Sequence, residues 1–107
     1  MESFTIRDLR ERTGDLVRGA EAGALSVVTR HGQPVFVAVP FDETLVALGV
    51  RVALAIKLFD DDTVSLGQAA KIAGVSTSEM IDLLGARGIA VARYSATEVD
   101  AELAALG

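Results

Sequence analysis

The first forty residues alternate between strand-like and helical spacings of apolar residues. Phe4-Thr5-Ile6 is predicted to form a short strand, and Thr5 and Asp8 have the spacing of a helix-capping pair. The apolar residues that follow recur at helical intervals, with polar residues between them. Thr13-Gly14 is predicted to divide this segment into a short helix and a longer one, and Gly23 to end it.

Two apolar runs, residues 25–29 and 35–39, flank the sequence Arg30-His31-Gly32-Gln33. A short loop that contains glycine is typical of a β-hairpin, because glycine accepts a positive φ. Both faces of the second run are apolar, so we expect one face to pack on the helices and the other on a second copy of the chain. The side chains predicted for that dimer interface are Val35, Val37 and Val39.

The rest of the chain has mainly helical signals. Pro40 ends the second strand, and the apolar segment 46–59 is predicted to be a buried helix that stops before Asp60-Asp61-Asp62. Three anions at a helix C-terminus oppose the partial negative charge there, so the triplet favours a solvated connection. An alternating strand is predicted at 89–94 and a last helix at 95–106.

Between these elements, residues 65–84 have the pattern of a helix-turn-helix. Ser65-x-x-Gln68 and Ser76-x-x-Glu79 have the spacing of capping boxes, and Gly74 lies between them where a sharp turn needs glycine. We therefore predict an α+β protein. A small strand-helix-helix-hairpin domain occupies residues 1–46, and a mostly helical module that contains the helix-turn-helix-like segment occupies residues 47–107.

Composition excludes several classes of function. The chain of 107 residues has 50% hydrophobic residues, no cysteine and one histidine, which rules out disulfides and thiolate metal sites. It contains neither a phosphate-binding glycine loop nor a nucleophile elbow, so we expect no enzyme activity, no metal and no cofactor. The longest apolar run is too short to span a bilayer and the N-terminus lacks a signal pattern. These features predict a cytoplasmic protein without membrane contact.

Charge is distributed unevenly along the chain. The net charge of −5 opposes binding to a polyanion unless basic groups gather on one face. Residues 7–31 hold five arginines and the only histidine against four acidic residues, whereas residues 60–107 hold eight acidic residues against three basic ones. The positive pole is therefore predicted in the N-terminal domain.

Arginine carries the predicted binding chemistry, because its planar fork can donate two hydrogen bonds to a guanine edge or hold a phosphate. We predict that Arg10 and Arg30 contact DNA and that Arg7, Arg12 and His31 strengthen the electrostatic attraction. A symmetric dimer would present these groups twice, matching a palindromic site. The second helix of the helix-turn-helix-like segment is instead rich in serine and acid, which favours packing or protein contact there.

Residues 3–46, with FTIRDLRERTGDL followed by VVTRHGQPVFVAVP, resemble the N-terminal domain of the Phd/YefM antitoxins. That resemblance implies a dimer that binds an operator palindrome, with an arginine of the first helix and one of the hairpin tip on DNA; these positions fall on Arg10 and Arg30. The chain departs from the family at Arg12-Thr13-Gly14 and at Thr44, where a tyrosine is frequent.

Residues 50–107, with LAIKLFDDDTVSLGQAAKIAG, resemble a functionally uncharacterised family of small prokaryotic proteins often encoded beside PIN-domain toxins. This resemblance implies a folded module that binds a cognate toxin, by analogy a PIN-like ribonuclease, although RelE-like and Doc-like toxins stay open. The two resemblances together predict an antitoxin that represses its own operon. The alternatives are a protein-interaction adaptor that does not bind DNA and a repressor without a toxin partner.

Overall fold

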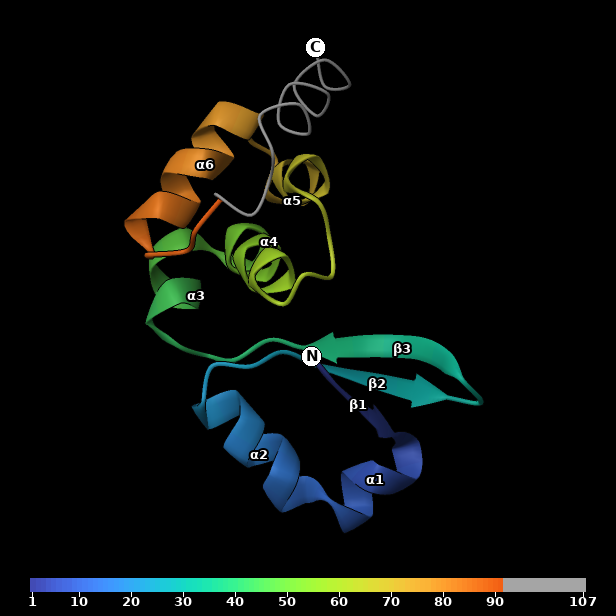
Figure 1. Cartoon of the computed structure of the whole chain (residues 1–107). Coiled ribbons are helices and arrows are strands. Elements are labelled where there is room, and N and C mark those ends of the chain that lie inside the picture. The colour runs from blue at the N-terminus through green and yellow to red at the C-terminus, as the bar shows by residue number, and fades with distance from the viewer. Residues whose placement is uncertain (92–107) are drawn as a thin grey trace. The chain divides into compact units, whose positions relative to one another are not determined.

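The structure, a computed structural model, describes residues 1–91. Its chain forms two compact units, Met1–Val50 and Arg51–Gly107 (Figure 1). The first unit contains a three-stranded sheet and the second is helical in its described part, so the predicted α+β class is confirmed. The predicted domain border after residue 46 falls within a helix of the first unit.

The first unit begins with a strand, two helices and a hairpin. The strands are β1 (Glu2–Thr5), β2 (Ser26–Arg30) and β3 (Gln33–Ala38), and the helices between β1 and β2 are α1 (Ile6–Glu11) and α2 (Thr13–Glu21). In the sheet, β2 lies in the centre, parallel to β1 and antiparallel to β3. Both helices lie on the same side of the sheet (Figure 1).

Local sequence explains where these helices begin and end. Thr5 caps α1 in a capping box with Asp8, as predicted. The break between the helices lies at Arg12, whose φ of −121° is not helical, one residue before the predicted Thr13-Gly14. Gly23, with a φ of +84°, follows α2 and turns the chain towards β2.

A small apolar core joins the helices to the sheet. Phe4 of β1 and Val28 of β2 are partners in the parallel register, and both are fully buried. Ser26, two residues earlier on the same strand and therefore on the same face, is also buried. A Cβ at Gly19 of α2 would lie 3.9 Å from the hydroxyl oxygen of Ser26, an ordinary van der Waals distance, which places this face of the helix next to the strand.

The prediction of one buried helix over residues 46–59 is wrong. Gly49, with a φ of +84°, separates α3 (Glu43–Leu48) from α4 (Val50–Asp60). Val46 and Val50 are 69% and 60% exposed, because the glycine interrupts the helix before the buried stripe begins at Ala53. Apolar composition predicted helix here, but composition does not reveal a change of direction at a single glycine.

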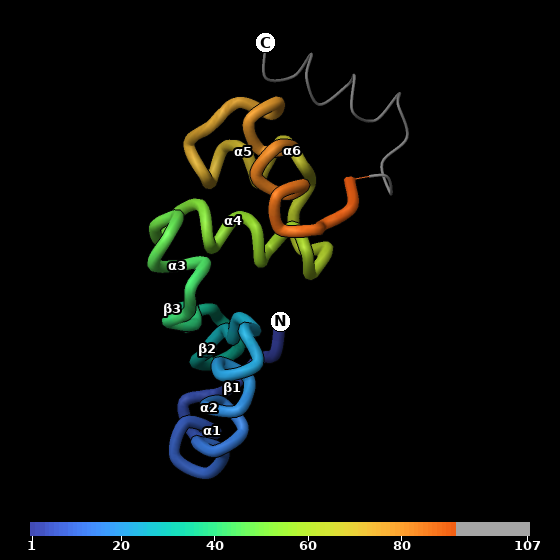
Figure 2. The backbone as a smooth tube through the Cα atoms, turned by 90° about the vertical axis from the view of Figure 1, so that its left-hand side faces the viewer, coloured from blue at the N-terminus to red at the C-terminus, as the bar shows by residue number. Residues whose placement is uncertain are grey.

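The second unit packs α4 against the pair α5 (Leu66–Ala73) and α6 (Thr77–Ala86) (Figure 2). Its largest buried side chains share one core, and they are Phe59, Leu66, Met80 and Leu84. Small side chains such as Ala55 of α4 and Ala69 of α5 are buried as well.

The predicted helix-turn-helix pattern is confirmed as local structure. Gly74 ends α5 in the left-handed conformation, and Ser65 forms the predicted capping box with Gln68. Ser76 accepts a hydrogen bond from the Glu79 backbone, but its hydroxyl also donates to the Glu79 carboxylate, so only half of that predicted box forms.

Only the first three residues of the strand predicted at 89–94 lie within the described residues. These residues, Ile89 to Val91, are not in a strand, and the rest of the predicted strand lies outside the described residues. The helix predicted at 95–106 also lies outside them.

Candidate nucleic-acid interface

The arginines of the first unit divide into two groups. Arg7 pairs with Glu11, Arg18 pairs with Asp15, and Arg12 contacts several carboxylates. Among the described residues, no acidic partner faces Arg10 or Arg30, and both are exposed. The two arginines predicted to contact DNA are therefore those whose guanidinium groups are available to an anion.

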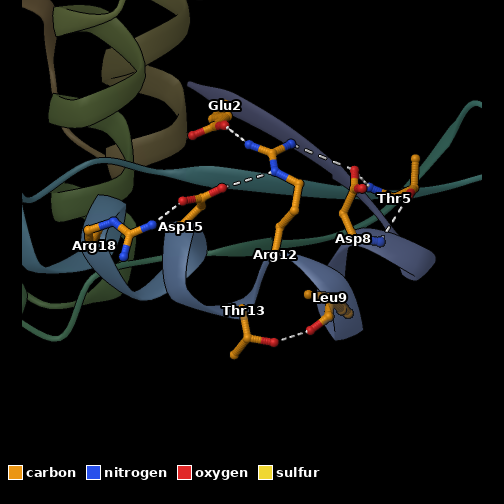
Figure 3. Close-up of polar contacts among 8 residues, drawn as sticks. All are labelled: Glu2, Thr5, Asp8, Leu9, Arg12, Thr13, Asp15 and Arg18. Atoms are coloured by element: carbon orange, nitrogen blue, oxygen red, sulfur yellow. Dashed lines mark hydrogen bonds and ion pairs between the residues drawn. The ribbon is translucent and has the colours of Figure 1, made fainter.

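Arg12 has a different environment (Figure 3). Its guanidinium donates hydrogen bonds to Glu2 of β1 and, at 3.2 Å, to Asp15 of α2, and it lies 3.9 Å from the Asp8 carboxylate of α1. Its central carbon also lies 4.8 Å from the centroid of the buried Phe4 ring, a cation–π contact. Arg12 was predicted to assist DNA binding, but its side chain is occupied by partners from three elements of its own unit.

This network shifts two pKa values. Hydrogen bonds to Glu2 and then to Asp15 raise the pKa of the Arg12 guanidinium, because the charged form is the donor. Hydrogen bonds from Arg12 and then from Arg18 lower the pKa of the Asp15 carboxyl. Asp15 thus links the two arginines that flank it.

The tip of the hairpin is a two-residue turn at His31 and Gly32, with φ values of +51° and +77°. Positive φ at both positions is characteristic of a type I′ turn, which matches the twist of the two strands. Arg30 and Gln33 are the last paired residues, and the side chains of Arg30 and His31 are exposed. The turn therefore projects an arginine and a histidine from the end of the sheet.

The parallel pairing of β1 and β2 brings α1 to the same end of the sheet as this turn. Thr5, the last residue of β1, is the partner of Thr29, which directly precedes Arg30. Since α1 starts at the next residue, Arg7 lies in its first turn, and Arg10 follows one helical turn, about 5 Å, later. Figure 1 shows α1 and the β2–β3 turn at one end of the sheet.

Two of the residues predicted for dimerisation, Val35 and Val37, lie on β3, an edge strand of the sheet, and Val39 follows the end of that strand. Val35 and Val37 are 55% and 38% exposed, and Val39 is half-buried. Val35 has no partner in the register, because a bulge opposite Val28 and Thr29 interrupts the pairing. Both faces of the strand expose apolar side chains, since Phe36 is 47% exposed as well.

Sequence reasoning did not single out the exposed apolar residues that follow β3. Phe41 is 87% exposed, and Val46 and Val50 on either side of Gly49 are also exposed. The feature of the sequence that could have predicted the exposure of Phe41 is its position between Pro40 and the N-cap Asp42, outside any regular element. Residues 35–50 thus carry most of the large exposed apolar side chains of the described chain.

Arg51 was also missed as a structural residue. Its guanidinium donates to the carbonyl oxygens of Ile72, at 2.9 Å, and Lys71, at 3.3 Å, at the C-terminus of α5. A cation placed there complements the partial negative charge at a helix C-terminus. In α6, by contrast, the exposed Glu79 and Asp82 would repel phosphate, in line with the predicted protein contact at this helix.

Comparison with protein families gives one match. The model of UPF0175, an uncharacterised protein family, matches residues 35–107, more than half of the chain. The chain belongs to the UPF0175 family. The match supports the predicted resemblance of residues 50–107 to an uncharacterised family and extends it to Val35, so β3 and α3 are part of the UPF0175 region. The Phd/YefM resemblance of residues 3–46 stays a prediction.

A curated UPF0175 protein of Aeropyrum pernix is 41% identical over 54 residues, which are 50% of this chain and 60% of that relative. The match thus spans about three fifths of the length of that relative. No solved structure matches the chain. Each helix within residues 1–91 is too short or insufficiently apolar to cross a bilayer.

Proposed function

We propose that this UPF0175 protein is the antitoxin of a type II toxin–antitoxin system. It would neutralise a cognate toxin by direct binding and, as a dimer, repress its own operon at a palindromic operator. The observation that carries the DNA-binding half is the pair Arg10 and Arg30, which are exposed and have no carboxylate partner among the described residues.

The availability of these two groups matters because the chain is acidic. With a net charge of −5, general attraction to DNA is weak, so affinity must come from a few well-placed cations. Arg10 and Arg30 act as base or phosphate contacts, while Arg7 and His31 add positive potential at the same end of the sheet. Arg12 is not assigned a DNA contact, since its guanidinium already donates to Asp15 and Glu2.

Dimerisation follows from β3. An edge strand that exposes Val35, Phe36 and Val37 presents both unpaired backbone groups and apolar surface. Because these side chains are 38–55% exposed, an interface that covers them gains about half of the roughly 1.5–3 kcal/mol that full burial of each would give. A two-fold axis at this edge presents the arginine pair twice, as a palindrome requires.

Toxin binding is assigned to residues 47–107, the module within the UPF0175 match. Its described helices form a core of their own and expose acid on α6, a surface suited to a basic protein rather than to nucleic acid. A PIN-like ribonuclease is the candidate partner. Co-purification of the tagged chain with the product of the adjacent gene tests this half, and a repressor without a toxin would purify alone.

The DNA-binding half is tested by anisotropy with the DNA fragment upstream of the protein's own gene. Arg10→Ala and Arg30→Ala should each weaken binding by roughly 1–3 kcal/mol and relax preference at one base position if they read a base. Arg18→Ala removes an arginine that is already paired with Asp15 and is the matched control, expected to change binding little. Equal losses for all three variants would contradict the assignment.

A protein-interaction adaptor is the second candidate, favoured by the acidic balance of the chain. Salt titration separates the two. A sequence-preferring complex whose affinity falls steeply with added salt supports the repressor, whereas the absence of a complex with DNA at low salt supports the adaptor.

A further inference from the structure

Arg12 lies where the two helices of the first unit meet. Its backbone N–H donates to the Asp8 carbonyl of α1, and its own carbonyl accepts from the N–H of Leu16 in α2. Its side chain reaches β1 as well, through Glu2 and the Phe4 ring. One residue therefore contacts β1, α1 and α2.

The Arg12 guanidinium is surrounded by carboxylates of its own unit. Nε donates to Asp15, one terminal nitrogen donates to Glu2, and the other faces Asp8 (Figure 3). A DNA phosphate at this position would meet three carboxylates around one cation, and their repulsion outweighs a single attraction. Direct contact of Arg12 with DNA does not fit this arrangement.

We propose that Arg12 is a positioning residue: it holds α1, and with it Arg7 and Arg10, against β1 and α2 so that they share an end of the sheet with Arg30. The acids Glu2 and Asp15 are then required for DNA binding, although each is an anion. This inference rests on the proposed DNA-binding function and adds to it the contacts that hold Arg7 and Arg10 in position.

The direction in which Glu2→Gln changes the affinity for DNA distinguishes a positioning role of Arg12 from a direct contact with DNA. Glu2→Gln removes an anion and weakens the hold on Arg12. If Arg12 contacted phosphate, this change would raise affinity for the upstream DNA fragment, because it releases the guanidinium and lowers the negative charge. Positioning predicts the opposite, an affinity lower by about threefold to tenfold.

A second pair of variants uses the shape of the side chain. Arg12→Lys keeps the charge but loses the planar fork that reaches Glu2 and Asp15 together and stacks on Phe4. Lysine is an adequate phosphate contact, so a contact role predicts little change, whereas positioning predicts a loss of about tenfold. Arg18→Lys is the matched control, since this exposed arginine has a single carboxylate partner, and it should bind like the wild type.

The salt dependence gives a readout that general instability would not produce. All variants are measured where they are fully folded. Because Arg12 holds Arg10 in place, Arg12→Gln and Arg10→Gln should lower the slope of log affinity against log salt alike, by about 0.9 if Arg10 makes one phosphate contact, and the double variant should lower it no further. A double variant whose slope falls by the sum of the two single changes would overturn the proposal.

Amide hydrogen exchange tests, in the absence of DNA, whether Arg12 holds α1 in place. Arg12→Lys should speed exchange across residues 10–16 while α5 and α6 remain protected. Unchanged protection at 10–16 overturns the positioning role whatever DNA binding shows. If exchange responds as expected but the wild type binds no upstream DNA, the proposed repressor function fails and the ordering of α1 by Arg12 stands by itself.

Discussion

At the scale of single residues, partners rather than residue type decide what each arginine does. Arg10 and Arg30 are predicted to contact DNA and Arg12 to assist them, yet the structure engages Arg12 with carboxylates and leaves the other two exposed. The Arg12 pairs with Asp8 and Asp15 were within reach of sequence reasoning, because they are three and four residues away on neighbouring helical turns. The pair with Glu2 was not, since it depends on where β1 lies.

His31 is predicted to strengthen DNA binding although its positive φ makes the hairpin turn less stable. It occupies the first turn position with a φ of +51°, where asparagine is more comfortable. His31→Asn should therefore not lower the free energy of unfolding, yet it should weaken binding to upstream DNA by about 1 kcal/mol if the imidazole contacts phosphate. Chemical denaturation and anisotropy measure the two effects. Unchanged affinity would make the histidine a turn residue only.

Asp15 predicts a pH dependence of stability. Because Arg12 and Arg18 lower its pKa in the folded state, folding favours the charged form. Its contribution is complete above the unfolded pKa, near 4, and is lost as pH falls through the lower folded value. Wild type should melt above Asp15→Asn at pH 6, and the gap should close below about pH 4. A gap that stays constant from pH 3 to 7 would contradict this.

At the scale of elements, capping and glycine signals predicted boundaries well, because they act within one turn of chain. Thr5 and Ser65 cap the N-termini of α1 and α5, and Gly74 ends α5, as their spacing predicted. Residues 46–59 were misjudged because a continuous apolar run hides the conformation of Gly49, which ends α3 with a positive φ. Its exposed neighbours Val46 and Val50 follow from that break.

Gly74 and Gly85 provide a matched pair of substitutions. Gly74→Ala puts a side chain at a φ of +75° and a Cβ 3.1 Å from the Arg51 guanidinium, so it should lower the free energy of unfolding by about 1–2 kcal/mol. Gly85→Ala fills open space on helix α6 and should raise it by about 0.5–1 kcal/mol. Denaturant unfolding measures both changes. A Gly74→Ala variant that is as stable as Gly85→Ala would show that the turn does not need glycine.

At the scale of the whole molecule, the acidic balance and the exposed apolar strand both point to assembly. A chain with a net charge of −5 needs its few available arginines duplicated to hold DNA, and β3 offers the surface that would duplicate them. Monomer burial alone leaves apolar side chains of residues 35–50 in water.

The dimer is tested by a pair of equally exposed valines. Val35→Asp places a charge on β3 and should convert the protein to monomers in sedimentation equilibrium, with weaker binding to upstream DNA. Val17→Asp changes a residue of α2 that is 49% exposed, against 55% for Val35, and should leave the assembly intact. A wild-type chain that sediments as a monomer at micromolar concentration would exclude this interface.

The sequence by itself determined the order of elements as far as the second strand of the hairpin, the hairpin turn, the caps at Thr5 and Ser65 and the concentration of arginine near the N-terminus, because these follow from spacing and from interactions within a few residues. Tertiary structure decided which arginines face solvent, since the pairing of β1 with β2 brings Glu2 and Phe4 to Arg12 and sets α1 beside the turn at Arg30. It also decided the exposure of Phe41 and Val46, because burial depends on what packs above a residue and not on how apolar that residue is.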